Sequence, residues 1–175
     1  MDLASHQRIL LGLIRSNYEV GRDDEDYFQL VARSPDLEEA RGNIFLWRVY
    51  VLERTCVLTV ALLRQRALLE PALQAFIQSR NVSPFREYQP LLFLESLAAH
   101  PDPLVVSVSQ FELALMKVRE GDAGSYIVPW QVDPRVVLHC LAQDVTVDET
   151  ASAGRYITRL SGSLPRLFDI ASVEG

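Results

Sequence analysis

The sequence predicts an α+β fold: a mostly helical N-terminal bundle over residues 1–121, followed by a small β-α-β-β module over residues 122–175. Two observations favour this division. Up to Arg119, apolar residues recur at spacings of three and four, as they do on the buried face of a helix. After Gly124, short runs of β-branched and aromatic residues are bounded by glycine and proline, which is typical of strands.

Three helices are expected in the first third of the chain. They cover residues 3–16, residues 24–33, and a long segment that begins at Ser34-Pro35 and continues to about residue 66. Serine is a good helix cap, and proline is tolerated in a first turn. Apolar residues surround the long segment on nearly all sides, so we predict the buried central rod of the bundle, with a break near Glu53-Arg54 left open.

The most regular helix of the bundle is predicted over residues 104–119. A helix from Pro71, a loop at residues 81–84 and a helix opened by Pro90 lead up to it. Its apolar stripe consists of Leu104, Val108, Phe111, Leu115 and Val118. Gly121 suits the left-handed conformation that commonly ends a helix.

The C-terminal module should combine one helix with three strands. Its expected elements are a strand at 125–128 closed by Pro129 and Trp130, a helix opened by Asp133-Pro134, and a hairpin of strands at 155–160 and 164–170. Pro165 predicts an edge position for the last strand, because proline cannot donate to a strand ladder. Some fifty residues make a small core, so we expect the module to dock on the helices.

Composition and charge restrict the class of protein. The chain has 17 Lys and Arg against 23 Asp and Glu, a formal net charge of −6, and its arginines are scattered singly. This balance disfavours a nucleic-acid partner, which needs a concentrated positive field. We expect no membrane partner, because the N-terminus has neither a secretory leader nor a spanning segment. Cys56 and Cys140 lie in apolar helical pattern, as buried thiols of a reducing compartment do, so a cytoplasmic location is expected.

No catalytic motif is recognisable, and we expect no catalytic residue, no metal ligand and no cofactor in this chain. His6, His100 and His139 lack a second candidate ligand at helical spacing, so a structural role is favoured for each. Glu95 and Glu112 each interrupt an apolar run, where burial could raise a carboxyl pKa. A charge on a helix face, or half of an ion pair, is the favoured interpretation of both.

Two groups of aromatic residues are candidates for recognition. Tyr126 and Trp130 alternate on one face of a short strand, and an unpaired strand edge can accept an extended peptide as an added strand. Packing in the small core is the simpler interpretation of this pair. Trp47, Tyr50 and Tyr88 could form an exposed recognition surface, although core packing is favoured for Trp47.

The order of features after Trp47 resembles the HvfC/BufC family, the bufferin-type partner proteins that assist peptide modification. The matching positions in the helical part are Phe76, Ser83, Pro84, Phe93, Leu94, Pro101, Phe111, Glu112 and Ala114. In the C-terminal part they are Tyr126, Ile127, Val128, Pro129, Trp130, Pro134, Leu138 and Leu141. The family's Tyr-Arg phrase is not clear at the N-terminus, and we take Trp47-Arg48 as its counterpart.

The resemblance implies a non-catalytic subunit. Such partner proteins bind a multinuclear iron oxygenase and help to present a cysteine-bearing precursor peptide to it, as the methanobactin partner protein does, and the oxygenase carries the iron. Transferred to this sequence, the expectation is a peptide-binding strand of Tyr126, Ile127, Val128 and Trp130. The expected contacts with the oxygenase are Trp47, Arg48 and Tyr50.

Two other classes of function stay open at the level of sequence. One is a DNA-binding regulator with a winged C-terminal element, which the acidic balance disfavours. The other is a small carboxylate-dependent enzyme that uses Glu95 or Glu112.

Overall fold

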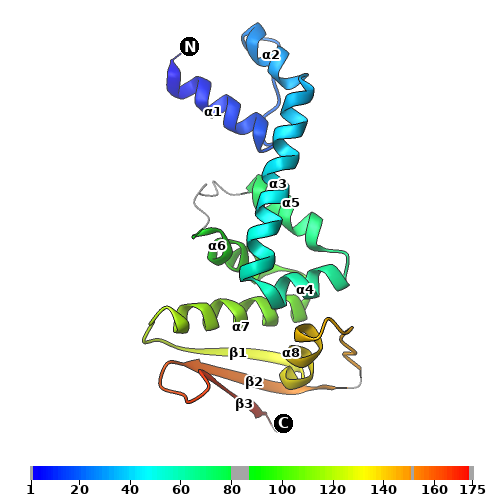
Figure 1. Ribbon diagram of the computed structural model, residues 1–175, viewed down its shortest axis with the longest axis vertical. Helices are drawn as coiled ribbons and strands as arrows, with labels where there is room; N and C mark the ends of the chain where they lie inside the picture. Colours follow the sequence, from blue (N-terminus) through cyan, green and yellow to red (C-terminus); the bar gives the residue numbers. More distant parts are fainter. Residues whose placement is uncertain (1, 80–86, 151, 174–175) are drawn as a thin grey trace.

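The computed structural model describes residues 2–79, 87–150 and 152–173, and it confirms the α+β fold with a β-α-β-β order at the C-terminus. The elements are α1 (Leu3–Ile14), α2 (Asp26–Ala32), α3 (Pro35–Thr55), α4 (Val57–Gln65), α5 (Leu69–Ser79), α6 (Gln89–Ser96), the 3-10 helix η1 (Leu97–Ala99), α7 (Pro103–Arg119), β1 (Ser125–Val132), α8 (Pro134–Ala142), β2 (Ala153–Ser161) and β3 (Phe168–Ser172). The molecule is elongated, with α1 and α2 at one end and the sheet at the other (Figure 1).

The sheet is antiparallel with the strand order β1-β2-β3, so β1 and β3 are its edges. Figure 1 shows α7 running alongside the sheet. Burial alternates along β1: Val128, Trp130 and Val132 are buried, whereas Ile127 is 63% exposed. One face of the sheet therefore packs on the helices and the other faces solvent.

Two details of the predicted strands are wrong. The first strand does not close at Pro129 and Trp130, because β1 continues to Val132. Pro165 lies in the loop between β2 and β3 and does not cause the edge position of β3. Proline fits within β1 because that strand is itself an edge, where a missing N–H leaves no ladder bond unmade.

The predicted central rod is two helices, α3 and α4, with the break at Cys56, where φ is −109° and ψ is 53°. It is also less buried than predicted. Leu46, Trp47 and Tyr50 on α3 are 66%, 50% and 46% exposed. The prediction of core packing for Trp47 is therefore wrong, because Trp47 lies on the side of α3 away from Phe45, Val49 and Leu52, which pack in or against the main core. The N-terminal part of α3 extends past that core to α1 and α2 (Figure 1). The loop predicted at residues 81–84 lies outside the described residues.

The main hydrophobic core runs from α3 to β2 without a break at residue 121, where the sequence suggested a boundary. Phe111 of α7 links the helices to the sheet in this core, since its ring centroid lies 6.0 Å from that of Trp130 and 5.3 Å from that of Phe168. The C-terminal module thus docks on the helices, as expected. A second core of four buried residues holds the other end together: Ile9, Leu13, Phe28 and Leu37.

Polar contacts reinforce the docking of the module. Arg66, at the end of α4, forms ion pairs with Asp102 and with Glu149. Gln65 donates from Nε2 to the carbonyl of Val145 at 2.9 Å. Both residues join the bundle to the segment between α8 and β2.

Within the described ranges, no helix is both long and apolar enough to cross a membrane.

Candidate functional site

One hollow lies between α7 and the edge strand β1, and a second lies between the start of α7 and the strands β1 and β2. Together their linings include the residues of β1 from Tyr126 to Gln131. The first, of about 300 Å³, is lined by Gln110, Leu113, Ala114, Lys117, Tyr126, Ile127 and Val128. The second, of about 500 Å³, is lined by His100, Pro101, Pro103, Val106, Ser107, Pro129, Trp130, Gln131, Arg155, Tyr156, Ile157 and Val173. We call this pair of hollows the α7/β1 groove.

The outer edge of β1 borders this groove, and one of its backbone carbonyls already has a hydrogen-bond partner on α7. Ser107 of α7 donates its hydroxyl to the carbonyl of Pro129 at 2.7 Å. Pro129 has no N–H, and its carbonyl bonds to a residue outside the sheet, so its backbone faces the groove. Because alternate residues of an antiparallel strand direct their backbone groups the same way, the N–H and C=O of Ile127 face the groove as well.

All four residues predicted to bind peptide line the groove, but they offer different groups to a ligand. The side chains of Val128 and Trp130 are each only 2% exposed, so the core interpretation holds for Trp130. Tyr126 donates its hydroxyl to Asp122 at 2.9 Å, and this hydrogen bond raises the pKa of the tyrosine. Ile127 alone projects a large exposed side chain.

The three residues predicted to contact the oxygenase do not share one surface. Trp47 and Tyr50 form an exposed stacked pair, with ring centroids 5.7 Å apart, and the guanidinium of Arg54 lies 4.5 Å from the Tyr50 ring. Arg48 faces the other way and is only 8% exposed. Successive residues of a helix differ by about 100° in direction, which separates Arg48 from Trp47.

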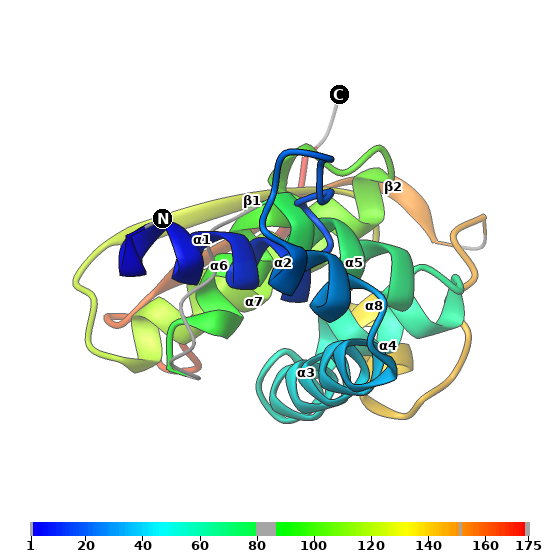
Figure 2. The ribbon, with the colours of Figure 1, turned by 90° about the horizontal axis from the view of Figure 1, so that it is seen from above.

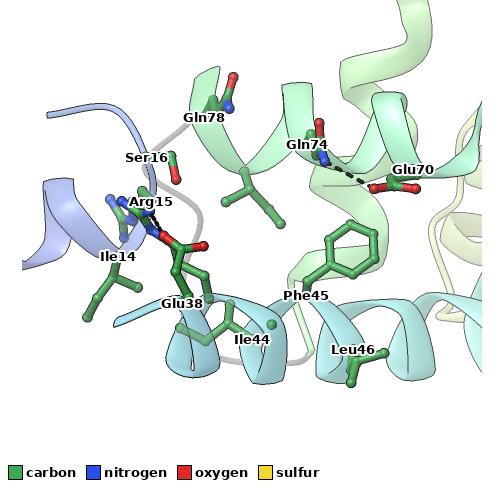
Figure 3. Close-up of a pocket in the computed structure, with 13 residues that line it drawn as sticks. Ile14, Arg15, Ser16, Glu38, Ile44, Phe45, Leu46, Glu70, Gln74 and Gln78 are labelled. Carbon is green, nitrogen blue, oxygen red and sulfur yellow. Dashed lines mark hydrogen bonds and ion pairs between the residues drawn. The ribbon is translucent and has the colours of Figure 1, made fainter. Parts of the chain in front are cut away.

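A third hollow, of about 510 Å³, is the cleft between α1, α3 and α5 that Figure 3 shows. Ile44 and Phe45 of α3 lie on one side, facing Gln74 and Glu70 of α5, and Arg15 follows the end of α1 (Figure 3). This cleft separates the small core from the main one.

The two glutamates in apolar runs have structural partners. Glu95 pairs with Lys117 at 3.6 Å, in agreement with the favoured interpretation. Glu112 is 6% exposed and accepts the backbone N–H groups of Leu58 at 3.0 Å and of Thr59 at 2.9 Å. Burial raises the pKa of Glu112, although these two hydrogen bonds oppose the rise.

The roles of two of these residues were not predicted from the sequence. Ser107 does not stand out in the sequence, because its bond to Pro129 joins positions 22 residues apart. Glu112 was singled out for chemistry or for a surface charge, whereas it caps the first turn of α4. The apolar run around Glu112 signalled its burial. Nothing local identified the helix that it caps.

Among the described residues, no group of three or more His, Cys, Asp and Glu side chains is placed to hold a metal ion. Cys56 and Cys140 are free thiols, and Cys56 is buried. Comparison with known protein families, with curated proteins and with solved structures finds no match to this chain.

Proposed function

We propose that this protein is a non-catalytic partner subunit that binds an extended peptide along β1 and presents it to a peptide-modifying enzyme. The observation that supports the proposal is the α7/β1 groove, in which an edge strand borders two hollows lined largely by apolar residues. An edge strand supplies backbone hydrogen bonds to an added chain, and the hollows beside it can take alternate side chains.

The groove restricts how a peptide would bind. Ile127 offers a backbone N–H and a carbonyl, whereas Pro129 offers no N–H and its carbonyl already accepts from Ser107. A bound strand would therefore form its firmest ladder bonds around Ile127 and rely on side-chain contacts beyond Pro129. Lys117 lies at one end of the groove and pairs with Glu95 at 3.6 Å, so its charge is already balanced there.

The identity of the partners rests on the resemblance to the HvfC/BufC family. On that basis the enzyme is a multinuclear iron oxygenase, which carries the iron, the peptide is its ribosomally made precursor, and the complex forms in the cytoplasm. Of the three residues first considered for the oxygenase contact, Trp47 and Tyr50 retain that role, because they are exposed and stacked. Arg48 is buried and does not belong to that surface.

Co-expression with a candidate oxygenase and its precursor, followed by size-exclusion chromatography, tests the proposal. All three chains should co-elute.

Ile127→Pro removes the N–H that faces the groove without removing a bond to β2, so it should release the peptide. Ile127→Val is the control and should retain the peptide. A Trp47→Ala/Tyr50→Ala double variant should lose the oxygenase and keep the peptide. Separate elution of the unmodified protein, with both partners supplied, would contradict the proposal.

A further inference from the structure

Arg48 occupies an unusual position for a charged residue. It lies on the inward stripe of α3, between Phe45 one turn before it and Leu52 one turn after it. Leu52 belongs to the main core, and Phe45 packs against that core and lines the cleft of Figure 3. The side chain of Arg48 is 8% exposed, whereas arginine is almost never buried without a partner.

Two nitrogen atoms of this guanidinium have no hydrogen-bond acceptor. In the part of the chain that the structure describes, Nε and Nη1 of Arg48 are both buried and both unbonded. Arg41, two turns earlier on the same stripe, provides the comparison. Its Nε and Nη2 donate to the carbonyl of Leu13 at 3.0 and 2.7 Å, and its Nη1 pairs with Glu38.

Among the described residues, no carboxylate forms an ion pair with Arg48. Burial is the larger cause that lowers the pKa of Arg48, and the charge of Arg15 lowers it further, but a guanidinium keeps its proton at neutral pH. A buried and unpaired charge is costly, and an anion with hydrogen-bond acceptors removes that cost. The carboxylates that line the cleft are already engaged: Glu38 pairs with Arg41, and Glu70 accepts from Gln74 at 3.3 Å.

From this arrangement we infer that Arg48 is an anion-binding residue, and that its ligand is an oxoanion that reaches the guanidinium from the side of Arg15, whose positive charge acts on it. Guanidinium groups match the planar oxygens of a carboxylate and the oxygens of a phosphate. The ligand belongs to one of these two classes, as a free ion or as a group on a larger molecule. This site is distinct from the α7/β1 groove, so its test does not depend on peptide binding.

Thermal unfolding of the whole chain at pH 7 and constant ionic strength provides the test. Sodium acetate and sodium phosphate are each titrated against sodium chloride. One or both should raise the midpoint temperature of the unmodified protein by about 2–4 °C, with saturation. The anion that acts at the lower concentration identifies the ligand as a carboxylate or a phosphate.

Variants distinguish a specific site from a general salt effect, which all variants would share. Arg48→Met keeps an unbranched, flexible stem and removes the charge, so it should unfold at a higher temperature than the unmodified protein in chloride and lose the saturable shift. Arg54→Met, at an exposed arginine of the same helix, should keep the shift. Arg48→Lys retains the charge and should keep a weaker shift. An equal shift in Arg48→Met, or no saturable shift in the unmodified protein, would overturn the inference.

Discussion

At the scale of single residues, Glu112 shows how a charge in an apolar run can serve the fold. The first residues of α4 have free N–H groups, and its N-cap, Cys56, supplies no side-chain hydrogen bond. The carboxylate of Glu112 on α7 takes this place by accepting from Leu58 and Thr59. Because a negative charge also suits the positive end of the helix dipole, the contact stabilises the junction of α4 and α7.

Replacing Glu112 with alanine should destabilise the protein by about 1–3 kcal/mol, because two buried N–H groups lose their acceptor. Urea unfolding followed by circular dichroism measures the change. Glu95→Ala is the matched control, since Glu95 is a partly exposed member of an ion pair, and it should change stability by no more than about 0.5 kcal/mol. Equal effects of the two substitutions would contradict the capping role.

The same carboxyl makes a prediction about pH. Burial raises the pKa of Glu112 in the folded state above its ordinary value of 4.5. Between the two pKa values, the folded state holds a proton that the unfolded state has released, so stability falls as the pH rises through this window. The free energy of unfolding, measured from pH 4 to pH 8, should therefore fall relative to that of Glu112→Gln. A relative increase with pH would show that the two N–H bonds outweigh burial and lower the pKa.

At the scale of elements, β1 is an edge strand with unpaired backbone groups, and it also carries a proline that limits pairing with a second copy of the chain. Natural edge strands often carry proline, since it removes a donor from the exposed side. Here Pro129 lies near the middle of the strand, and its carbonyl accepts a hydrogen bond from the Ser107 hydroxyl. The edge is therefore unsuited to long, regular pairing with a second copy, yet it retains bonding capacity around Ile127. This combination fits the binding of a short peptide.

Substituting Pro129 with valine should promote self-association, because the new N–H completes the donor row on the exposed edge. Sedimentation velocity over a range of concentrations should show more dimer or higher oligomer than for the unmodified chain. Pro134→Ala, in the first turn of α8, is the control and should leave association unchanged. If the valine variant associates no more than the control does, Pro129 does not guard the edge.

At the scale of the whole molecule, two cores of unequal size share one helix. The main core joins α3 through α7 to the sheet, whereas the small core has four buried side chains from α1, α2 and the start of α3. Figure 2, which looks from above, shows α1 and α2 placed over the helices of the main core. Their attachment relies mainly on α3, so the two ends should differ in local stability.

Native-state hydrogen exchange should reveal this difference. Amides of α1 and α2 are expected to exchange faster than those of α7 and β2, because fewer buried contacts oppose their opening. Phe28→Ala should increase exchange in α1 and α2 alone, since Phe28 is fully buried in the small core. Phe111→Ala should destabilise the whole protein by about 3–5 kcal/mol. Loss of protection in α7 and β2 caused by Phe28→Ala would contradict independent opening.

Local sequence patterns located many of the element boundaries. Ser34 and Asp133 are both followed by proline, and each accepts a backbone N–H at the start of its helix. Gly121 has the positive φ, 93°, that was expected after α7. These features were predictable because capping and proline geometry involve neighbours in the chain. The candidate strand for peptide binding was found in the same way, from β-forming residues bounded by glycine.

The sequence by itself thus determined the fold class, the β-α-β-β order and most helix starts, since these depend on contacts within a few residues. Only the tertiary structure decided that Trp47 is exposed, that two buried nitrogen atoms of Arg48 have no acceptor among the described residues, and that Ser107 donates to the carbonyl of Pro129. The physical reason is that burial and hydrogen bonding depend on which elements pack together. Helical periodicity shows that a face is apolar, but the partner that covers it, or leaves it open, is set by the whole chain.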